Sequence, residues 1–463
     1  MRSAKIHPSP AAMWRNELRA CVVLGLPLVL TNAIEMVMNF TSAVMIGHIS
    51  PDALAASTLA LALYNVALLF GIGLTAAVSP LVARGAGRHG EESEAVRRIV
   101  WGGFWNAALV VGPIWGVLWE AEPIFRILGQ DPALSRAAAG YLHVVQWSLL
   151  PVLIYLVLRS MLAALERPRW AVATGAAAVG ANAILNALLI GGAGPLPGMG
   201  LIGSGIATLL SNVFMAAALA LVVALDPGFR SFRIFSGLFR PPWQAVAALW
   251  RLGLPIGIAV VLEVGMFTAA AALVGHYDRG ALAAHAIALQ IASFTFMVPL
   301  GIAQAATVRV ARAAGLGDSH AIGRAGWTAL ALGVGAMGVS SVVLVSMPRP
   351  IIGLFLDPAA PGAEAITRGA VTLLALAALF QVADGAQAVL AGMLRGLGDT
   401  RAPMAIAAVG YWGVGIPLAA TLARRAAAPG VWIGLVAGLF TVAALLFARW
   451  RSWRRASRLG GAR

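Results

Sequence analysis

Long apolar runs separated by short polar connections dominate the chain. Each run is close to or above the roughly 20 residues that an α-helix needs to cross the core of a bilayer. The pattern predicts twelve transmembrane helices, near residues 20–46, 53–82, 99–119, 137–158, 169–192, 200–224, 247–275, 281–308, 322–346, 369–394, 402–422 and 429–449. The boundary between the last two is the least defined, because Arg424 and Arg425 lie in it. We therefore predict an all-α polytopic membrane protein.

The first and seventh runs are copies of each other. Leu24-Gly25-Leu26-Pro27 matches residues 252–255, and in the same register Glu35 falls on Glu263. Over residues 24–87 against 252–315, 22 of the 64 aligned positions are identical. A shared apolar composition would scatter alanine and leucine matches and would not align a carboxylate. The repeat predicts two pseudo-symmetric lobes of six helices each.

The repeat and the polar connections define the predicted domains. The longest polar connection lies where the repeat restarts, and we take it as the link between the lobes. The predicted parts are a cytoplasmic N-terminal tail at 1–19, an N-lobe at 20–224, a cytoplasmic linker at 225–246, a C-lobe at 247–449 and a basic cytoplasmic tail at 450–463.

Composition agrees with a membrane protein. The 463 residues are 60% hydrophobic and 11% charged, whereas a soluble domain has about 25% charged residues. The net charge of +15 does not indicate a nucleic-acid partner, because the arginines are dispersed between apolar runs. Placing the N-terminus in the cytoplasm puts 26 of the 33 Lys and Arg residues on that side, as the positive-inside rule requires. We predict a membrane protein with both termini in the cytoplasm.

Three acids lie well inside apolar runs, Glu35, Glu263 and Asp384, and the last two stand out. Glu263 is central in residues 252–275, which would measure about 36 Å as a helix. An ionised carboxylate at that depth costs at least a few kcal/mol, so such residues are usually functional. Asp384 lies in the tenth run, with Gln381 and Gln387 three residues to either side on the same helix face. We predict that Glu263 and Asp384 bind a coupling cation, and that they are metal ligands if that cation is sodium.

Further polar and apolar residues accompany these acids. Glu35 is either a third coupling acid or an ancestral copy whose role has passed to the second half. Among the amides, we single out Asn182 and Asn186, four residues apart on one helix, and Gln290. They either hold helices together or contact a cation. Adaptable apolar side chains near the acidic helices either pack in the core or line a pocket for flat cations; these are Met36, Met266, Phe267 and Phe294.

Several stretches resemble the multidrug and toxic compound extrusion (MATE) family, in its bacterial cation-coupled branch. They include LGLPIGIAVVLEVGMF in the seventh run, QVADGAQAVLAGMLRGLGDTRAP in the tenth and YWGVGIPLA in the eleventh. The resemblance implies twelve helices around a central cleft and efflux of organic cations in exchange for sodium ions or protons. It also implies that Glu263 and Asp384 are the coupling acids of the second lobe, with Asn182 and Asn186 as the polar pair of the first.

The chain departs from the family pattern in the first run. Many members carry an aspartate there, in a pattern like VDTVMAG, whereas this chain has TSAVMIG with Ser42 at that position. The sequence therefore lacks that acid, and Glu35, two turns earlier, is the alternative.

Together with these residues, the resemblance implies a secondary active antiporter of the bacterial inner membrane that exports small cationic amphipathic compounds by alternating access. We expect it to act as a monomer, to contact lipid and to use no cofactor. One alternative is an exporter or flippase of a polar or lipid-linked metabolite in the same superfamily. An intramembrane aspartyl protease fits less well, because Asp384 lacks a Gly-x-Gly-Asp setting and no second such aspartate lies in a run. A channel is the third alternative, and its flux would not respond to ion gradients.

Overall fold

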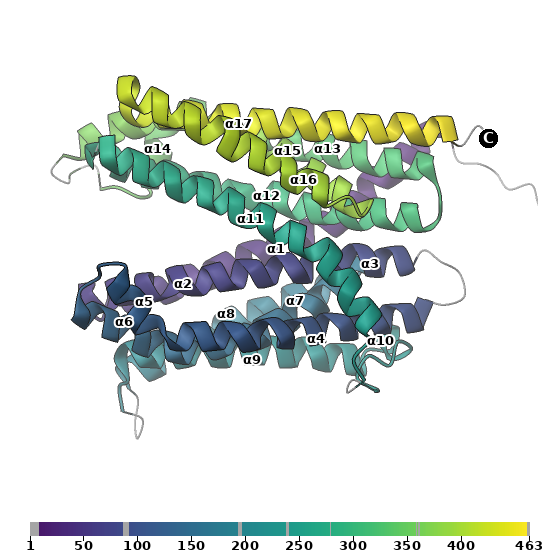
Figure 1. Cartoon of the computed structure of the whole chain (residues 1–463), viewed down its shortest axis with the longest axis horizontal. Coiled ribbons are helices and arrows are strands. Elements are labelled where there is room, and N and C mark those ends of the chain that lie inside the picture. Colours follow the sequence, from purple (N-terminus) through teal and green to yellow (C-terminus); the bar gives the residue numbers. More distant parts are fainter. Residues whose placement is uncertain are drawn as a thin grey trace, which may run out of the picture. The chain divides into compact units, whose positions relative to one another are not determined.

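All regular structure in the described part of the chain is helical (Figure 1). The computed structural model describes residues 9–86, 92–192, 197–237, 240–277, 279–357, 359 and 362–460. Within these ranges, 11 helical stretches are long and apolar enough to cross a membrane. The last of them, Arg401–Ala456, has 56 residues, which is enough for two crossings at about 1.5 Å per residue. The predicted all-α, multi-span fold class is therefore confirmed.

The last two spans form a hairpin whose bend lies at Ala427. This residue has a left-handed backbone (φ 46°, ψ −129°) inside the long helix α17 (Ile416–Gly460). Pro429 follows two residues later, and proline disrupts a continuous helix because it lacks an N–H donor. A side chain at Gly434 would overlap the backbone of Ala419, so the two arms of the hairpin are in close contact. The bend thus lies between the predicted runs 402–422 and 429–449, in the boundary that contains Arg424 and Arg425.

We expect Gly434→Ala to destabilise the hairpin by about 1–3 kcal/mol, the usual range for overpacking a close contact. The added methyl group would have to displace the backbone of Ala419. The measurement is the midpoint of thermal unfolding in detergent. Gly335→Ala is the matched control, because a Cβ at Gly335 meets nothing within 4 Å. Equal midpoints for the two variants would contradict the close contact.

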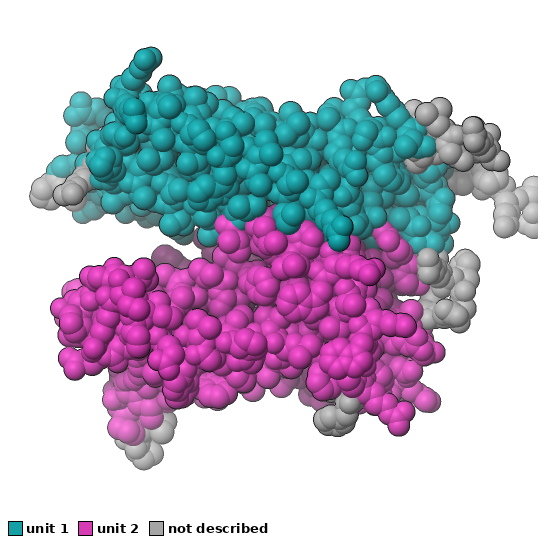
Figure 2. Space-filling view, in the orientation of Figure 1, with its two compact units in different colours: residues 1–29, 262–463 teal, residues 30–261 magenta. Residues whose placement is uncertain are grey.

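Contacts divide the chain into two compact units, which Figure 2 shows in different colours. Unit 1 comprises residues 1–29 and 262–463, and unit 2 comprises residues 30–261. The divisions fall inside helix α1 (Pro10–Gly47) and inside helix α11 (Trp243–Tyr277). Each of these helices therefore contributes one part to each unit. The lobes predicted from the repeat begin at 20 and 247 instead, and their boundaries stay a prediction.

Unit 2 is built from short and long helices around one apolar core. Its buried residues include Tyr64, whose hydroxyl is 2.7 Å from Ser148 Oγ. Trp115 packs against this core, and its Nε1 atom donates to the Gln146 carbonyl over 2.8 Å. Besides parts of α1 and α11, the unit contains α2 (Pro51–Ala76), α3 (Val78–Gly85), α4 (Glu92–Trp119), α5 (Ala121–Ile127), α6 (Pro132–Val145), the 3₁₀ turn η1 (Gln146–Ser148), α7 (Leu149–Ala164), α8 (Arg169–Gly191), α9 (Gly200–Leu225) and α10 (Pro227–Arg230).

Unit 1 is organised around two long helices, α12 (Leu282–Gly315) and α15 (Ala363–Gly396). They approach closely at Gly392, where a side chain would overlap the backbone of Ala303. Thr307 Oγ1 reinforces the contact by donating to the Gly392 carbonyl over 2.9 Å. The other elements are η2 (Arg279–Ala281), α13 (Ser319–Ser346), α14 (Pro348–Ile352), α16 (Arg401–Ala407), the π-helix η3 (Ala408–Gly415) and α17.

The regions predicted as tails and linker contain helical residues. Helix α1 begins at Pro10, so part of the predicted N-terminal tail continues directly into the first span. The predicted linker contains α10 and the start of α11, and α17 extends to Gly460. Residues 1–8 and 461–463 of the predicted tails lie outside the described residues.

Candidate functional site

Two acids of unit 1 share one amide group. Glu263 lies in α11, whereas Asp384 and Gln387 lie one turn apart in α15. The Gln387 Nε2 atom donates to Glu263 Oε1 over 3.1 Å and to Asp384 Oδ1 over 3.1 Å. Asp384 and Gln387 are buried, and Glu263 is partly buried. The structure therefore brings together both of the acids that the sequence singled out, through one of the predicted accessory amides.

A buried tyrosine orients this amide. The Tyr411 hydroxyl donates to Gln387 Oε1 over 3.1 Å, which directs the NH₂ group of Gln387 toward the two carboxylates. Tyr411 belongs to the π-helix η3, and its neighbour Trp412 donates from Nε1 to the Leu262 carbonyl, over 3.0 Å, next to Glu263. Short π-helical segments occur often at functional sites, where the extra residue re-aims a side chain. The wider turn of η3 thus directs Tyr411 toward α15 and its neighbour Trp412 toward α11.

Positive charge reaches the site from the end of α15. Arg395 lies eleven residues after Asp384, which places both on the same helix face. It interacts electrostatically with Glu263 and with Tyr411. Two carboxylates and one guanidinium leave a net negative charge when both acids are ionised. The arrangement favours binding of a single cation.

Gln381 lies one turn before Asp384 and extends the polar face of α15. It is 1% exposed, and neither its side-chain nitrogen nor its oxygen has a hydrogen-bond partner within the described structure. Gln381, Asp384 and Gln387 are all buried, as the sequence pattern requires of a polar face on a membrane helix. No group of three His, Cys, Asp or Glu side chains that suits a metal ion occurs among the described residues.

The apolar candidates of unit 1 differ in their surroundings. Met266 is fully buried and packs inside the unit, whereas Phe294 is 61% exposed and Gln290 is exposed on the same helix α12. The Phe267 ring packs on Phe380, with centroids 5.9 Å apart. Only Phe267 therefore belongs to a buried aromatic group next to the polar face of α15.

That aromatic group continues to a buried histidine. Phe380 contacts Trp432 with centroids 5.7 Å apart, and Trp432 Nε1 donates to His285 Nδ1 over 3.1 Å. His285 is 2% exposed, and its Nε2 atom has no partner among the described residues. The sequence places His285 just inside the eighth run, and the structure adds the tryptophan that positions it.

Glu35 is neutralised inside unit 2. Arg159 Nη1 donates to Glu35 Oε1 over 2.6 Å, and Arg159 Nη2 donates to Asn32 Oδ1. The apolar pattern ends the fourth run at 158 and assigns Arg159 to a connection, but α7 continues to Ala164 and buries this arginine. That assignment was wrong. The apolar residues 161–164 that follow Arg159 are the signal that would have extended the helix.

A neutral polar cluster occupies unit 2 around the position where the family pattern has an aspartate. Ser42 Oγ donates to Asn182 Oδ1 over 2.9 Å, and Asn182 Nδ2 donates to Ser211 Oγ over 3.3 Å. Asn186 Nδ2 donates to Asn182 Oδ1 over 3.0 Å and to Ser42 Oγ over 3.4 Å. The predicted amide pair therefore contacts Ser42 directly. Met36 lies partly buried on α1, the helix that also contains Ser42.

Comparison with known proteins identifies the family. A family model described as MatE matches residues 27–188 and 255–421, which together exceed half of the chain. The chain belongs to the MatE family. Each matched block contains all but the first three residues of one copy of the internal repeat, and the second block contains Glu263, Asp384 and Tyr411. The protein is accordingly a membrane transporter and not an enzyme.

Relatives of this MatE protein cover nearly its full length. A probable multidrug resistance protein NorM from Mesorhizobium japonicum is 48% identical over 444 residues, covering 96% of this chain and 95% of the relative. A protein of the same name from Brucella suis biovar 1 is 46% identical over 445 residues, covering 96% and 94%. The crystal structure of MATE in complex with MaL6 has a TM-score of 0.87 at 18% identity, covering 98% of this chain and 100% of the other. That last likeness concerns the fold alone.

Proposed function

We propose that this MatE protein exports cationic amphipathic organic compounds in exchange for protons or sodium ions, by alternating access. The observation that carries the proposal is the pair of acids, Glu263 and Asp384, on one amide nitrogen inside membrane-spanning helices. The names of the NorM relatives support an exporter of varied small molecules.

Charge competition at this site links the two ligands. A proton or sodium ion that binds at Glu263 and Asp384 cancels the negative charge that a cationic substrate requires. Loss of that ion restores the charge for the next substrate. Each ligand lowers the affinity of the site for the other by the same factor. This competition is enough to exchange the ion for the substrate, and no second binding site is needed. Sodium, if it is the coupling ion, would have the two carboxylates as its protein ligands.

We assign coupling to unit 1 because Glu35, the candidate acid of unit 2, has a fixed counterion. Glu35 is paired with Arg159, so it presents little free charge to a mobile cation. The Ser42, Asn182 and Asn186 cluster is neutral, and we assign it a supporting role through hydrogen bonds. The distribution of arginine supports our proposal that both termini lie in the cytoplasm. We further propose that the transporter acts as a monomer in a bacterial inner membrane.

Tyr411→Phe is expected to raise the half-saturating concentration of the coupling ion by about 5-fold, the equivalent of one hydrogen bond worth about 1 kcal/mol. Without the hydroxyl, the Gln387 amide can rotate and present its oxygen or nitrogen to the acids. Export rates measured against the concentration of the driving ion test this. Tyr277→Phe, at an exposed tyrosine at the end of α11, is the control. An unchanged half-saturating concentration would show that Tyr411 does not position the amide.

The test of the proposed function is dye efflux from proteoliposomes under separately imposed gradients. Purified protein is reconstituted with ethidium, and either a pH gradient or a sodium gradient is applied. Export driven by one of them supports the antiport proposal and identifies the ion. Flux that follows the ethidium gradient alone, with no response to either ion, would refute it in favour of a channel.

A further inference from the structure

An apolar groove lies between the start of α1 and helix α13, within unit 1. Its volume is ≈ 410 Å³, inside the range of roughly 300–1,000 Å³ typical of small-ligand sites. The residues that line it include Trp14, Arg15 and Leu18 from α1 and Trp327, Thr328 and Ala331 from α13. Neither Glu263 nor Asp384 contributes, so the groove is separate from the proposed coupling site.

One buried hydroxyl in the groove has no partner. Thr328 is 7% exposed, and its Oγ1 atom makes no hydrogen bond within the described structure. A hydroxyl in an apolar environment is costly unless it is hydrogen-bonded. This oxygen atom is closed off from solvent, and rotation of the Thr328 side chain toward the groove would let an ester or carbonyl oxygen of a ligand accept its hydrogen bond.

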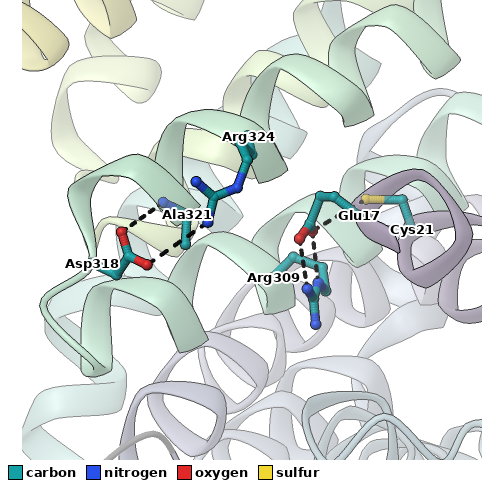
Figure 3. Close-up of polar contacts among 6 residues, drawn as sticks. All are labelled: Glu17, Cys21, Arg309, Asp318, Ala321 and Arg324. Atoms are coloured by element: carbon teal, nitrogen blue, oxygen red, sulfur yellow. Dashed lines mark hydrogen bonds and ion pairs between the residues drawn. The ribbon is translucent and has the colours of Figure 1, made fainter. Parts of the chain in front are cut away.

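The mouth of the groove has an excess of positive charge. The acids closest in sequence to the lining residues are already engaged: Glu17 accepts two hydrogen bonds from Arg309, over 2.8 and 2.7 Å, and Asp318 caps α13 while facing Arg324 at 3.8 Å (Figure 3). Arg15 and Arg19 are exposed and form no ion pair among the described residues. Their charges are therefore available to an anion.

Aromatic contacts connect the α13 side of the groove to a further cation, Arg451. The Trp327 ring packs edge-on against Phe447 with centroids 5.8 Å apart, and the Arg451 guanidinium lies 5.8 Å from the centre of the Phe447 ring. The arginine distribution places this end of the helices in the cytoplasm. Tryptophan and arginine side chains concentrate where the hydrocarbon meets the headgroups. The groove therefore has the surroundings of a site in the cytoplasmic leaflet.

We propose that the groove binds one acyl chain of an anionic phospholipid from the cytoplasmic leaflet. The chain lies along Trp14, Leu18 and Ala331, the Thr328 hydroxyl donates to an ester carbonyl, and Arg15 contacts the phosphate. A zwitterionic lipid offers the same chain and ester, so the selectivity comes from Arg15. Basic pockets between membrane helices on the cytoplasmic side bind anionic headgroups for the same reason.

Native mass spectrometry of the full-length protein tests the proposal, with phosphatidylglycerol and phosphatidylcholine added separately in detergent. We expect wild-type protein to retain phosphatidylglycerol about 5-fold more strongly, the effect of one arginine near an anionic headgroup. Arg15→Gln should remove this preference. Ala331→Trp should fill the groove and lower retention of both lipids. Thr328→Val, which has nearly the same shape, should weaken both by a similar factor.

Matched controls separate this site from general adhesion of lipid. Arg230→Gln removes an exposed arginine from the predicted linker, and Ala217→Trp adds a bulky side chain at an exposed position of α9. Neither should change retention of either lipid. Equal retention of the two lipids by wild-type protein, or an undiminished preference in Arg15→Gln, would overturn the proposal. Retention that survives Ala331→Trp would show that the lipid binds elsewhere.

Discussion

Asp384→Asn and Glu263→Gln are each expected to lower ion-driven ethidium export by about 100-fold, near the upper end of typical coupling factors. Each change removes one of the two charges that contact Gln387, while it keeps the size and hydrogen-bonding capacity of the side chain. The neutral side chain imitates the ion-bound state permanently, so the site can no longer alternate between ion and substrate. The measurement is dye efflux from proteoliposomes under the gradient that drives the wild-type protein.

A matched variant separates this effect from a loss of folded protein. Asp52→Asn makes the same chemical change at an exposed position near the start of α2, and it should export at nearly the wild-type rate. All variants should reach the membrane in similar amounts and elute alike in detergent. Near-normal export by purified Glu263→Gln protein would remove the basis for assigning coupling to these acids.

Arg159→Gln is expected to destabilise the protein by about 3 kcal/mol, the lower end of the cost of removing one partner from a buried ion pair. The lower end applies because the Glu35 side chain is still 32% exposed, whereas the Arg159 side chain is 7% exposed. The variant removes the ion pair with Glu35 and the hydrogen bond from Arg159 to Asn32. The loss should be visible as a lower midpoint of thermal unfolding in detergent.

A double variant tests whether Glu35 is a structural acid or a coupling acid. The double variant Arg159→Gln with Glu35→Gln removes both charges, and we expect it to recover most of the lost stability. Arg98→Gln, which breaks an exposed pair with Glu94, is the control and should cost at most about 1 kcal/mol. If Arg159→Gln unfolded at the wild-type temperature while Glu35→Gln lost export, Glu35 would be a coupling acid and its pairing incidental.

The apolar pattern was a reliable guide to the helices and a weaker guide to where they end. An apolar run must continue across the hydrocarbon, so its existence is evident from composition. Its end is less evident, because arginine can extend into a helix when a partner is present. Arg159 shows this, since its place within α7 depends on Glu35, which is far away in sequence.

The acids of unit 1 were likewise identifiable because each interrupts an apolar run. Their shared hydrogen-bond donor, Gln387, was not identifiable, because Glu263 and Asp384 are 121 positions apart and lie on different helices. The role of Tyr411 is a similar case. Nothing local in the sequence distinguishes it from the other tyrosines of the chain, and only the π-helix directs it at Gln387.

The sequence by itself determined that this chain is a multi-span helical membrane protein with an internal repeat and with acids inside its apolar runs, because apolar length and isolated charges are local properties. The tertiary structure alone decided which of those charges is compensated. Glu35 has Arg159 beside it, whereas Glu263 and Asp384 share one amide. The physical reason is that the state of a buried charge depends on its neighbours in space, and folding selects those neighbours from distant parts of the chain.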